Sequence, residues 1–226
     1  MNIGFHRVRV WDLPTRLFHW ALMLCVLGAV GTGLVGGTAM IWHFRLGQAV
    51  LALLAFRLVW GLVGGRWSRF ASLPLSPRSL LAYLRGRAGV SLRTGHSPLG
   101  ALAVLGFLLV LATQVATGLV SDDEIAWLGP LSHLVSNATV SAATSYHRFW
   151  GKWLILSLVL LHLLAITWYS LKGHKLVPAM VHGDKTLDEP MLASRDDRAS
   201  RLVAALLFGL SVALSVWVFS LAPAGF

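Results

Sequence analysis

The sequence predicts an all-α integral membrane protein, built as a four-helix transmembrane bundle with a fifth, C-terminal transmembrane helix. The chain has 226 residues, of which 56% are hydrophobic and only 12% are charged. Its mean hydropathy is +0.71. Soluble domains carry about twice this share of charged residues, so the composition indicates a polytopic membrane protein.

Five long apolar stretches supply the predicted helices, and each is close to or above the roughly 20 residues that cross a bilayer. The first and third contain no charged residue, and the second contains only Arg57. We divide the chain into a four-helix domain, 1–185, and a linker with the extra helix, 186–226. The five stretches are Leu17–Trp42, Leu46–Gly65, Pro98–Ser121, about Trp153–Leu171, and Leu202–Phe226.

The chain has a net charge of +10, and its basic residues are distributed in the pattern of a membrane topology. Basic residues gather before the first stretch, between the second and third, where Arg66–Arg93 holds six arginines, and between the fourth and fifth. The other two connections are poor in Lys and Arg, and one contains the acidic run Asp122–Glu124. This alternation fits the positive-inside rule. We therefore expect a membrane protein with a cytoplasmic N-terminus and a C-terminus on the outer side, and no nucleic-acid partner.

The cysteine count narrows the redox chemistry available to the chain. Cys25 is the only cysteine. An intrachain disulfide, a C-x-x-C-H attachment site for c-type haem and a cysteine-ligated iron–sulfur cluster are therefore all excluded.

Four histidines lie at or inside the apolar stretches: His19, His43, His147 and His162. The topology puts His43 and His147 near the outer surface and His19 near the cytoplasmic one. His162 follows His147 by 15 residues, which is about 22 Å along a helix and roughly 60° around it. His162 therefore reaches the depth of His19, and the four histidines form two pairs at two levels.

Each pair offers two imidazoles from different helices, which is what a six-coordinate haem b requires. The bundle is therefore predicted to bind two haems b, with these four histidines as axial ligands of the iron. A histidine at a helix end, such as His43 or His147, is also a common interfacial group. His162 lies within an apolar run, where an ionisable side chain is a functional candidate by default.

Arg57 is the one charged residue inside the second stretch. It follows His43 by 14 residues, about 21 Å along a helix, and so reaches the depth of the His19/His162 pair. A buried guanidinium needs an anionic partner, and a haem propionate would supply one. Snorkelling toward the inner headgroups is the alternative.

Several segments resemble the bacterial cytochrome b561 / Ni-hydrogenase b-type cytochrome family. They are VWDLPTRLFHW (10–20), FRLVWGLVGGRWSRF (56–70), GHSPLGAL (95–102) and HRFWGKW…LH (147–162), in the order of the family and within residues 5–185. The resemblance implies two b haems ligated from helices one, two and four by His19, His43, His147 and His162. The fifth helix lies outside the four-helix core of the family.

The resemblance also implies a route for electrons. Family members pass electrons between membrane quinone and a redox partner, which is a hydrogenase, a cytochrome c or, in one branch, superoxide. His96, in the GHSPLG segment, would lie near the cytoplasmic haem and contact a quinone or a propionate. The quinone would be ubiquinone or menaquinone.

We therefore expect a dihaem b-type cytochrome that transfers electrons between the quinone pool and a periplasmic cytochrome c or oxidoreductase subunit. Two alternatives stay open: a stand-alone superoxide:quinone oxidoreductase, and a haem-free transporter or membrane anchor. Whether the chain is an enzyme by itself is open too. A homodimer is compatible with the sequence, and the lipid bilayer is the other expected partner.

Overall fold

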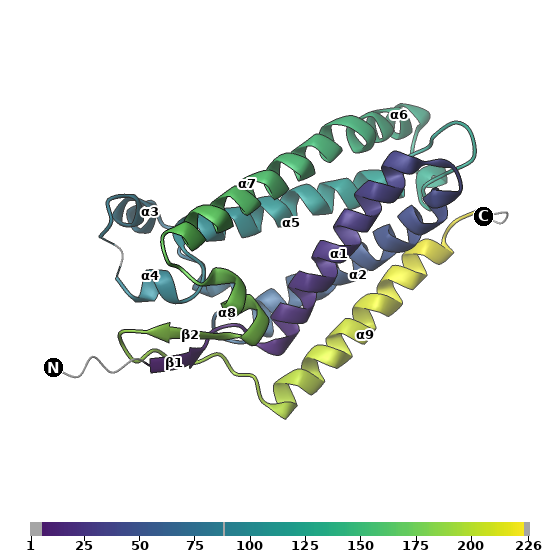
Figure 1. Cartoon of the computed structure of the whole chain (residues 1–226). Helices are drawn as coiled ribbons and strands as arrows, with labels where there is room; N and C mark the ends of the chain where they lie inside the picture. Colours follow the sequence, from purple (N-terminus) through teal and green to yellow (C-terminus); the bar gives the residue numbers. More distant parts are fainter. Residues whose placement is uncertain (1–5, 88, 224–226) are drawn as a thin grey trace. The chain divides into compact units, whose positions relative to one another are not determined.

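The computed structural model describes residues 6–87 and 89–223, and it is predominantly helical (Figure 1). Within these residues, five helices are long and apolar enough to cross a membrane. This confirms the predicted fold class and the five spans. The long helices are α1 (Leu13–Val35), α2 (Met40–Val63), α5 (Pro98–Leu119), α7 (Lys152–Leu171) and α9 (Arg198–Ser220).

Short elements connect the long helices. Ser76 caps α3 and Ser136 caps α6, because each serine side chain accepts a hydrogen bond from a backbone amide in the first turn. The short helices are η1 (Gly37–Ala39), η2 (Phe70–Ser72), α3 (Pro77–Leu84), α4 (Ser91–Thr94), η3 (Ser132–Leu134), α6 (Asn137–Ser145), η4 (Tyr146–Gly151) and α8 (Leu176–His182), and the strands are β1 (His6–Arg9) and β2 (Asp184–Leu187).

The length of the first apolar stretch predicted a single helix, but the structure divides this stretch between two helices. α1 ends at Val35, where Gly36 and Gly37 take φ values of 69° and 56°. Only glycine adopts this left-handed region without strain. The chain reverses here, so Trp42 belongs to α2 and not to the first span.

The chain forms two compact units that are interleaved in the sequence. Unit 1 consists of the described parts of Met1–His19, Arg57–Gly106 and Leu160–Leu207. Unit 2 consists of those of Trp20–Phe56, Phe107–Val159 and Phe208–Phe226. The division of the sequence at residue 185 stays a prediction.

In unit 1, β1 and β2 pair antiparallel, with Arg9 opposite Asp184. Both Arg7 and Arg9 form ion pairs with Asp184, each at 2.7 Å. Val8, Val10, Trp11, Trp67, Ala179 and Leu187 form an apolar cluster under this ladder. The ladder joins the segment before α1 to the segment after α8.

Asp12 fixes the start of α1 in unit 1. Its side chain is fully buried, and it accepts hydrogen bonds from the amides of Thr15 (2.9 Å) and Gly65 (3.2 Å), the indole of Trp60 (3.3 Å) and the hydroxyl of Ser68 (2.6 Å). A buried carboxylate is tolerated when its oxygens accept several such bonds. The network therefore attaches the N-terminus of α1 to the end of α2 and the loop after it.

The core of unit 2 is aliphatic. Val50 and Leu54 of α2 pack with Leu111 of α5 and Ile155 of α7. η4 is a π-helix that lies between α6 and α7, and it carries His147. π-Helical turns are rare and occur frequently at functional sites.

Candidate functional sites

His43 and His147 face each other in unit 2. His43 comes from α2 and His147 from the π-helix η4, and their ring centroids are 5.9 Å apart with the ring planes nearly perpendicular, at 89°. The structure therefore brings together the two histidines predicted for the outer level.

Backbone carbonyls set the tautomer of both rings. His43 Nδ1 donates to the carbonyl of Ala29 at 2.8 Å, and His147 Nδ1 donates to the carbonyl of Gln114 at 2.9 Å. A carbonyl can only accept, so each Nδ1 carries the proton and each neutral ring keeps its lone pair on Nε2. This is the state of a metal-ligating histidine, whose other ring nitrogen donates to a carbonyl or carboxylate.

A cavity of about 720 Å³ surrounds this pair, within the range of cofactor pockets. Glycines make room for the two imidazoles. A Cβ added at Gly33 would lie 3.0 Å from His43 Nδ1, and one at Gly118 would lie 2.7 Å from His147 Cε1. The remaining walls are mainly aliphatic and include Val26, Val30, Leu34, Leu111, Val115 and Ile155.

His19 and His162 form the second pair, in unit 1. His19 lies in the second turn of α1 and His162 in the middle of α7, and their ring centroids are 6.4 Å apart with the planes at 52°. The structure thus brings together the pair predicted for the cytoplasmic level as well.

Both separations fit one metal ion held between two imidazoles. A metal–imidazole bond is about 2 Å long, so the centres of two rings that ligate one ion from opposite sides are about 6 Å apart. The observed values are 5.9 and 6.4 Å. Within the described residues, no group of three or more His, Cys, Asp or Glu side chains gathers as a metal cluster. The donor sets match a cofactor that brings its own equatorial ligands, as a porphyrin does.

Arg57 is buried in unit 1, with 3% of its surface exposed. Its guanidinium lies 4.7 Å from the ring centroid of Phe70 and 5.9 Å from that of Phe18. Its Nη1 is buried and has no hydrogen-bond partner among the described residues. A buried guanidinium with a free N–H group can bind an anionic ligand. Because Arg57 is almost fully buried, its side chain does not snorkel toward water.

His96 precedes α5 in the same unit, and its ring centroid lies 4.6 Å from that of Trp11, with the two ring planes tilted by 60°. Its Nδ1 is buried and has no hydrogen-bond partner among the described residues. Burial, followed by the positive charges of Arg57 and Lys185, lowers the pKa of His96. The neutral form is therefore favoured at physiological pH.

Lys185 of β2 fixes the backbone just before His96. Its Nζ donates to the carbonyls of Thr94 (2.8 Å) and Gly95 (3.3 Å) and lies 5.8 Å from the ring centroid of Trp11. Burial lowers the pKa of Lys185 to about 8, so the ammonium form prevails at neutral pH.

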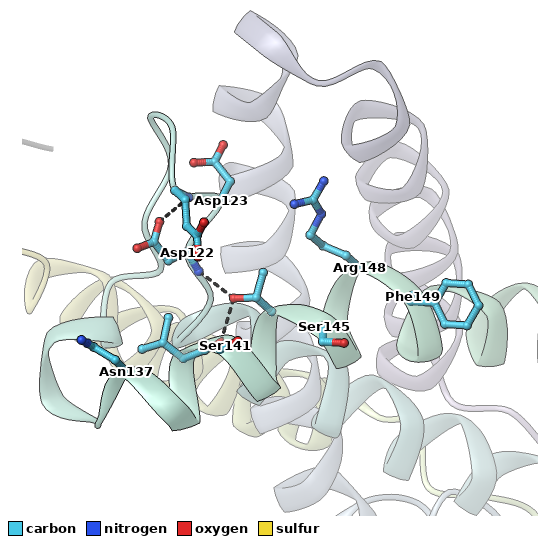
Figure 2. Close-up of a pocket in the computed structure, with 10 residues that line it drawn as sticks. Asp122, Asp123, Asn137, Ser141, Ser145, Arg148 and Phe149 are labelled. Atoms are coloured by element: carbon cyan, nitrogen blue, oxygen red, sulfur yellow. Dashed lines mark hydrogen bonds between the residues drawn. The ribbon is translucent and has the colours of Figure 1, made fainter.

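Unit 2 also contains a polar pocket of about 610 Å³, and Figure 2 shows Asp122 and Asp123 on its loop side and Arg148 on its helical side. Asp123 accepts hydrogen bonds from the amides of Ile125, Ala126 and Trp127. Although burial opposes it, these hydrogen bonds lower the pKa of Asp123. The turn itself accounts for this aspartate, and a docked partner is not needed to explain it.

The sequence reasoning missed the groups that orient the histidines. The carbonyls of Ala29 and Gln114 carry no side-chain signature, since every residue offers a carbonyl. Gly118, a glycine close to the end of an apolar span, only weakly suggested a close contact in the sequence. The π-helix has no recognisable sequence pattern.

A family model for prokaryotic cytochrome b561 matches residues 10–183. The chain belongs to the prokaryotic cytochrome b561 family. This confirms the resemblance seen in the sequence. The protein is therefore a multi-pass membrane cytochrome of the b type, an electron-transfer protein, and a b-type cytochrome binds haem b.

Two relatives of this cytochrome b561 are similar over most of their length. The probable Ni/Fe-hydrogenase 1 B-type cytochrome subunit of Escherichia coli K12 is 25% identical over 209 residues, covering 77% of this chain and 88% of the relative. The probable Ni/Fe-hydrogenase B-type cytochrome subunit of Bradyrhizobium diazoefficiens is 21% identical over 217 residues, covering 81% and 87%. No solved structure matches the chain.

Proposed function

We propose that this cytochrome b561 holds two haems b and passes electrons between the quinone pool and a periplasmic redox partner. One observation carries the proposal: each of two histidine pairs lies within one compact unit, at ring separations of 5.9 and 6.4 Å. A single haem site would leave one pair of apposed imidazoles without a role.

In unit 2, His43 and His147 would hold the haem through Nε2, because each Nδ1 is occupied by a backbone carbonyl. Bound between them, the iron supplies one-electron redox chemistry. Gly33 and Gly118 keep the neighbouring backbone close to the rings. Most of the cavity wall is aliphatic, which suits the apolar surface of a porphyrin.

In unit 1, His19 and His162 would hold the second haem. Arg57 and His96 would meet its carboxylates or the head of a quinone. Two buried nitrogens that lack a hydrogen-bond partner among the described residues, Nη1 of Arg57 and Nδ1 of His96, support this assignment. Arg57 would offer a charge-assisted hydrogen bond to a propionate, and neutral His96 would offer a second polar contact.

The periplasmic partner would be an oxidoreductase subunit, and the names of both relatives favour a Ni/Fe-hydrogenase. A cytochrome c is the other candidate. We infer from the basic loops that the segment before α1 is cytoplasmic and the segment after α9 is periplasmic, in a bacterial inner membrane. Ubiquinone or menaquinone would be the membrane-phase partner.

A second candidate, a stand-alone superoxide:quinone oxidoreductase, has one observation in its favour. Arg148 and Lys152 line the same cavity as His43 and His147, and cations at a haem edge attract small anions. Asp122 and Asp123 line it too, which weakens the attraction. Quinone reduction by the purified chain on addition of superoxide alone would favour this candidate over electron carriage.

Absorption spectra of the detergent-purified protein, with pyridine haemochrome quantification, test the proposal. We expect two haems b per chain and a low-spin spectrum. His162→Ala should lose the haem of unit 1 and His147→Ala that of unit 2, whereas His133→Ala, at an exposed histidine, should keep both. One haem in the wild type would refute one pair, and none would leave the transporter or anchor alternative.

A further inference from the structure

The helix α3 (Pro77–Leu84) has no role in the histidine sites, yet its two faces differ sharply. Ser76 caps it, with the side-chain hydroxyl accepting from the amide of Ser79, and Pro77 occupies its first turn. The sequence around it is strongly basic, because no Asp or Glu occurs between Asp12 and Asp122. The start of the helix is therefore well defined, and all charged residues near it in the sequence are positive.

One face of α3 attaches it to a membrane span. The hydroxyl of Tyr83 lies 2.6 Å from that of Tyr169, which sits two residues before the end of α7. Since α7 belongs to a helix long and apolar enough to cross a bilayer, and Lys172 and Lys175 follow its end directly, we place that end near the membrane surface. α3 is therefore held at the depth of the lipid headgroups.

The opposite face is apolar and open. Leu81 and Leu84 lie three residues apart and share a stripe of the helix, and their exposed fractions are 47% and 62%. Leu75, just before the helix, is 46% exposed. An exposed leucine stripe on a short helix at the membrane surface is typical of an interfacial segment.

Arginines flank the leucine stripe. Arg78 and Arg85 are seven residues apart, so they lie on one side of the helix, and Arg87 follows. All three are exposed, and none belongs to a salt bridge found among the described residues. Lipid phosphates are the anions present at this depth, and basic residues beside an amphipathic helix bind anionic headgroups.

We propose that α3 lies in the plane of the bilayer surface and binds anionic phospholipid. Leu75, Leu81 and Leu84 insert among the upper acyl chains, and Arg78, Arg85 and Arg87 contact the phosphates. The proposal does not depend on the haem assignment, because neither the leucines nor the arginines belong to a histidine site.

Spin labelling tests where α3 lies. Cys25 is the only cysteine, so a Cys25→Ser background accepts a single label at Leu81→Cys. The full chain would be placed in nanodiscs of phosphatidylcholine with phosphatidylglycerol, and the label's accessibility to oxygen and to a water-soluble nickel chelate would be measured. Leu164→Cys, an exposed leucine of the α7 span, is the lipid reference, and Asp188→Cys, on an exposed loop, is the water reference.

We expect Leu81 to match Leu164, with ready access for oxygen and little for nickel. A match to Asp188 would place the leucine face in water and overturn the proposal. Protection from both reagents would mean protein contact, and it would overturn the lipid assignment in favour of a protein occupant.

Lipid retention tests the arginines. Phosphatidylglycerol that stays with the protein through detergent washing would be counted by mass spectrometry. The double variant Arg78→Gln/Arg85→Gln should retain at least threefold less than the matched control Arg69→Gln/Arg198→Gln, whose arginines are also exposed. Equal retention in the two variants would refute anionic lipid binding by α3.

Discussion

Gly118 limits how closely α5 can approach the imidazole of His147. A Cβ at this position would lie 2.7 Å from His147 Cε1, which is shorter than any ordinary carbon–carbon contact. The ring is held by its hydrogen bond to Gln114, so it cannot move away without breaking that bond. We predict that Gly118→Ala reduces the haem content from two to about one per chain, measured by pyridine haemochrome, and leaves the unit 1 haem in place.

Gly209 provides the matched control for this substitution. It lies in the long helix α9, and a Cβ there would meet no atom of the described residues within 4 Å. Gly→Ala inside a helix gains about 1 kcal/mol of helix propensity at either site. Gly209→Ala should therefore keep both haems, and loss of haem from it would mean that helix propensity, and not the contact with His147, is responsible.

Arg57 should raise the midpoint potential of the unit 1 haem. A buried positive charge favours the reduced form of a nearby redox centre, and Arg57 is almost fully buried. Replacing it by Gln should lower that potential on the order of 60 mV, a tenfold change in a one-electron equilibrium. Spectroelectrochemical titration would resolve the two haems. As a control, Arg69→Gln, at an exposed arginine, should change neither midpoint potential. If Arg57→Gln also left both potentials unchanged, Arg57 would not lie close to the haem.

At the residue scale, the sequence predicted which histidines lie together but not which backbone groups orient them. The pairs His43/His147 and His19/His162 followed from depth along predicted spans, because helical rise converts residue spacing into distance. The carbonyls that orient two of these rings could not be predicted, since they depend on which backbone the fold brings near. His96 and Arg57 were predicted as site residues, but only the fold revealed that each has a buried nitrogen without a hydrogen-bond partner in the described part of the chain.

At the scale of elements, Asp12 determines how α1 joins the loop after α2. Its carboxylate is the acceptor for two amides, an indole and a hydroxyl. Each buried donor left without an acceptor costs about 1–3 kcal/mol. We predict that Asp12→Ala lowers the free energy of unfolding by about 3 kcal/mol or more, and that Asp12→Asn lowers it less because one acceptor oxygen remains.

Thermal unfolding in detergent, followed by tryptophan fluorescence, measures this effect. Asp188→Ala removes an exposed carboxylate in the same unit and should leave the midpoint unchanged. If Asp12→Ala unfolded at the wild-type temperature, the network would not be a stabilising element.

The long helices were predictable because hydropathy alone determines them. Their ends were not, since the first apolar run hides the reversal at Gly36 and Gly37. The pairing of β1 with β2 joins residues more than 170 positions apart, and no local pattern signals such a contact. The π-helix at His147 also escapes periodicity, because a single wider turn shifts the face only locally.

At the scale of the whole molecule, the charge distribution and the odd number of spans together predict the sidedness. α9 is integrated into the fold, since Ser215 donates to the carbonyl of Gln48 at 2.7 Å and Phe208 packs on Phe56 at 5.9 Å. It is therefore not a detached tail, and its length and apolarity suit a fifth span. With five spans, we expect the segment after α9 on the side opposite the segment before α1.

Reporter fusions test this sidedness. Green fluorescent protein fluoresces only in the cytoplasm, and alkaline phosphatase is active only in the periplasm. A fusion after Pro223 should give active phosphatase and no fluorescence. A fusion after Asp197, which removes α9, should reverse both signals, because the chain then ends after four spans. If the two fusions reported the same side, α9 would not cross the membrane. Active phosphatase in the fusion after Asp197 would put the end of the fourth span in the periplasm, and the placement of His43 and His147 at the periplasmic face would then be wrong.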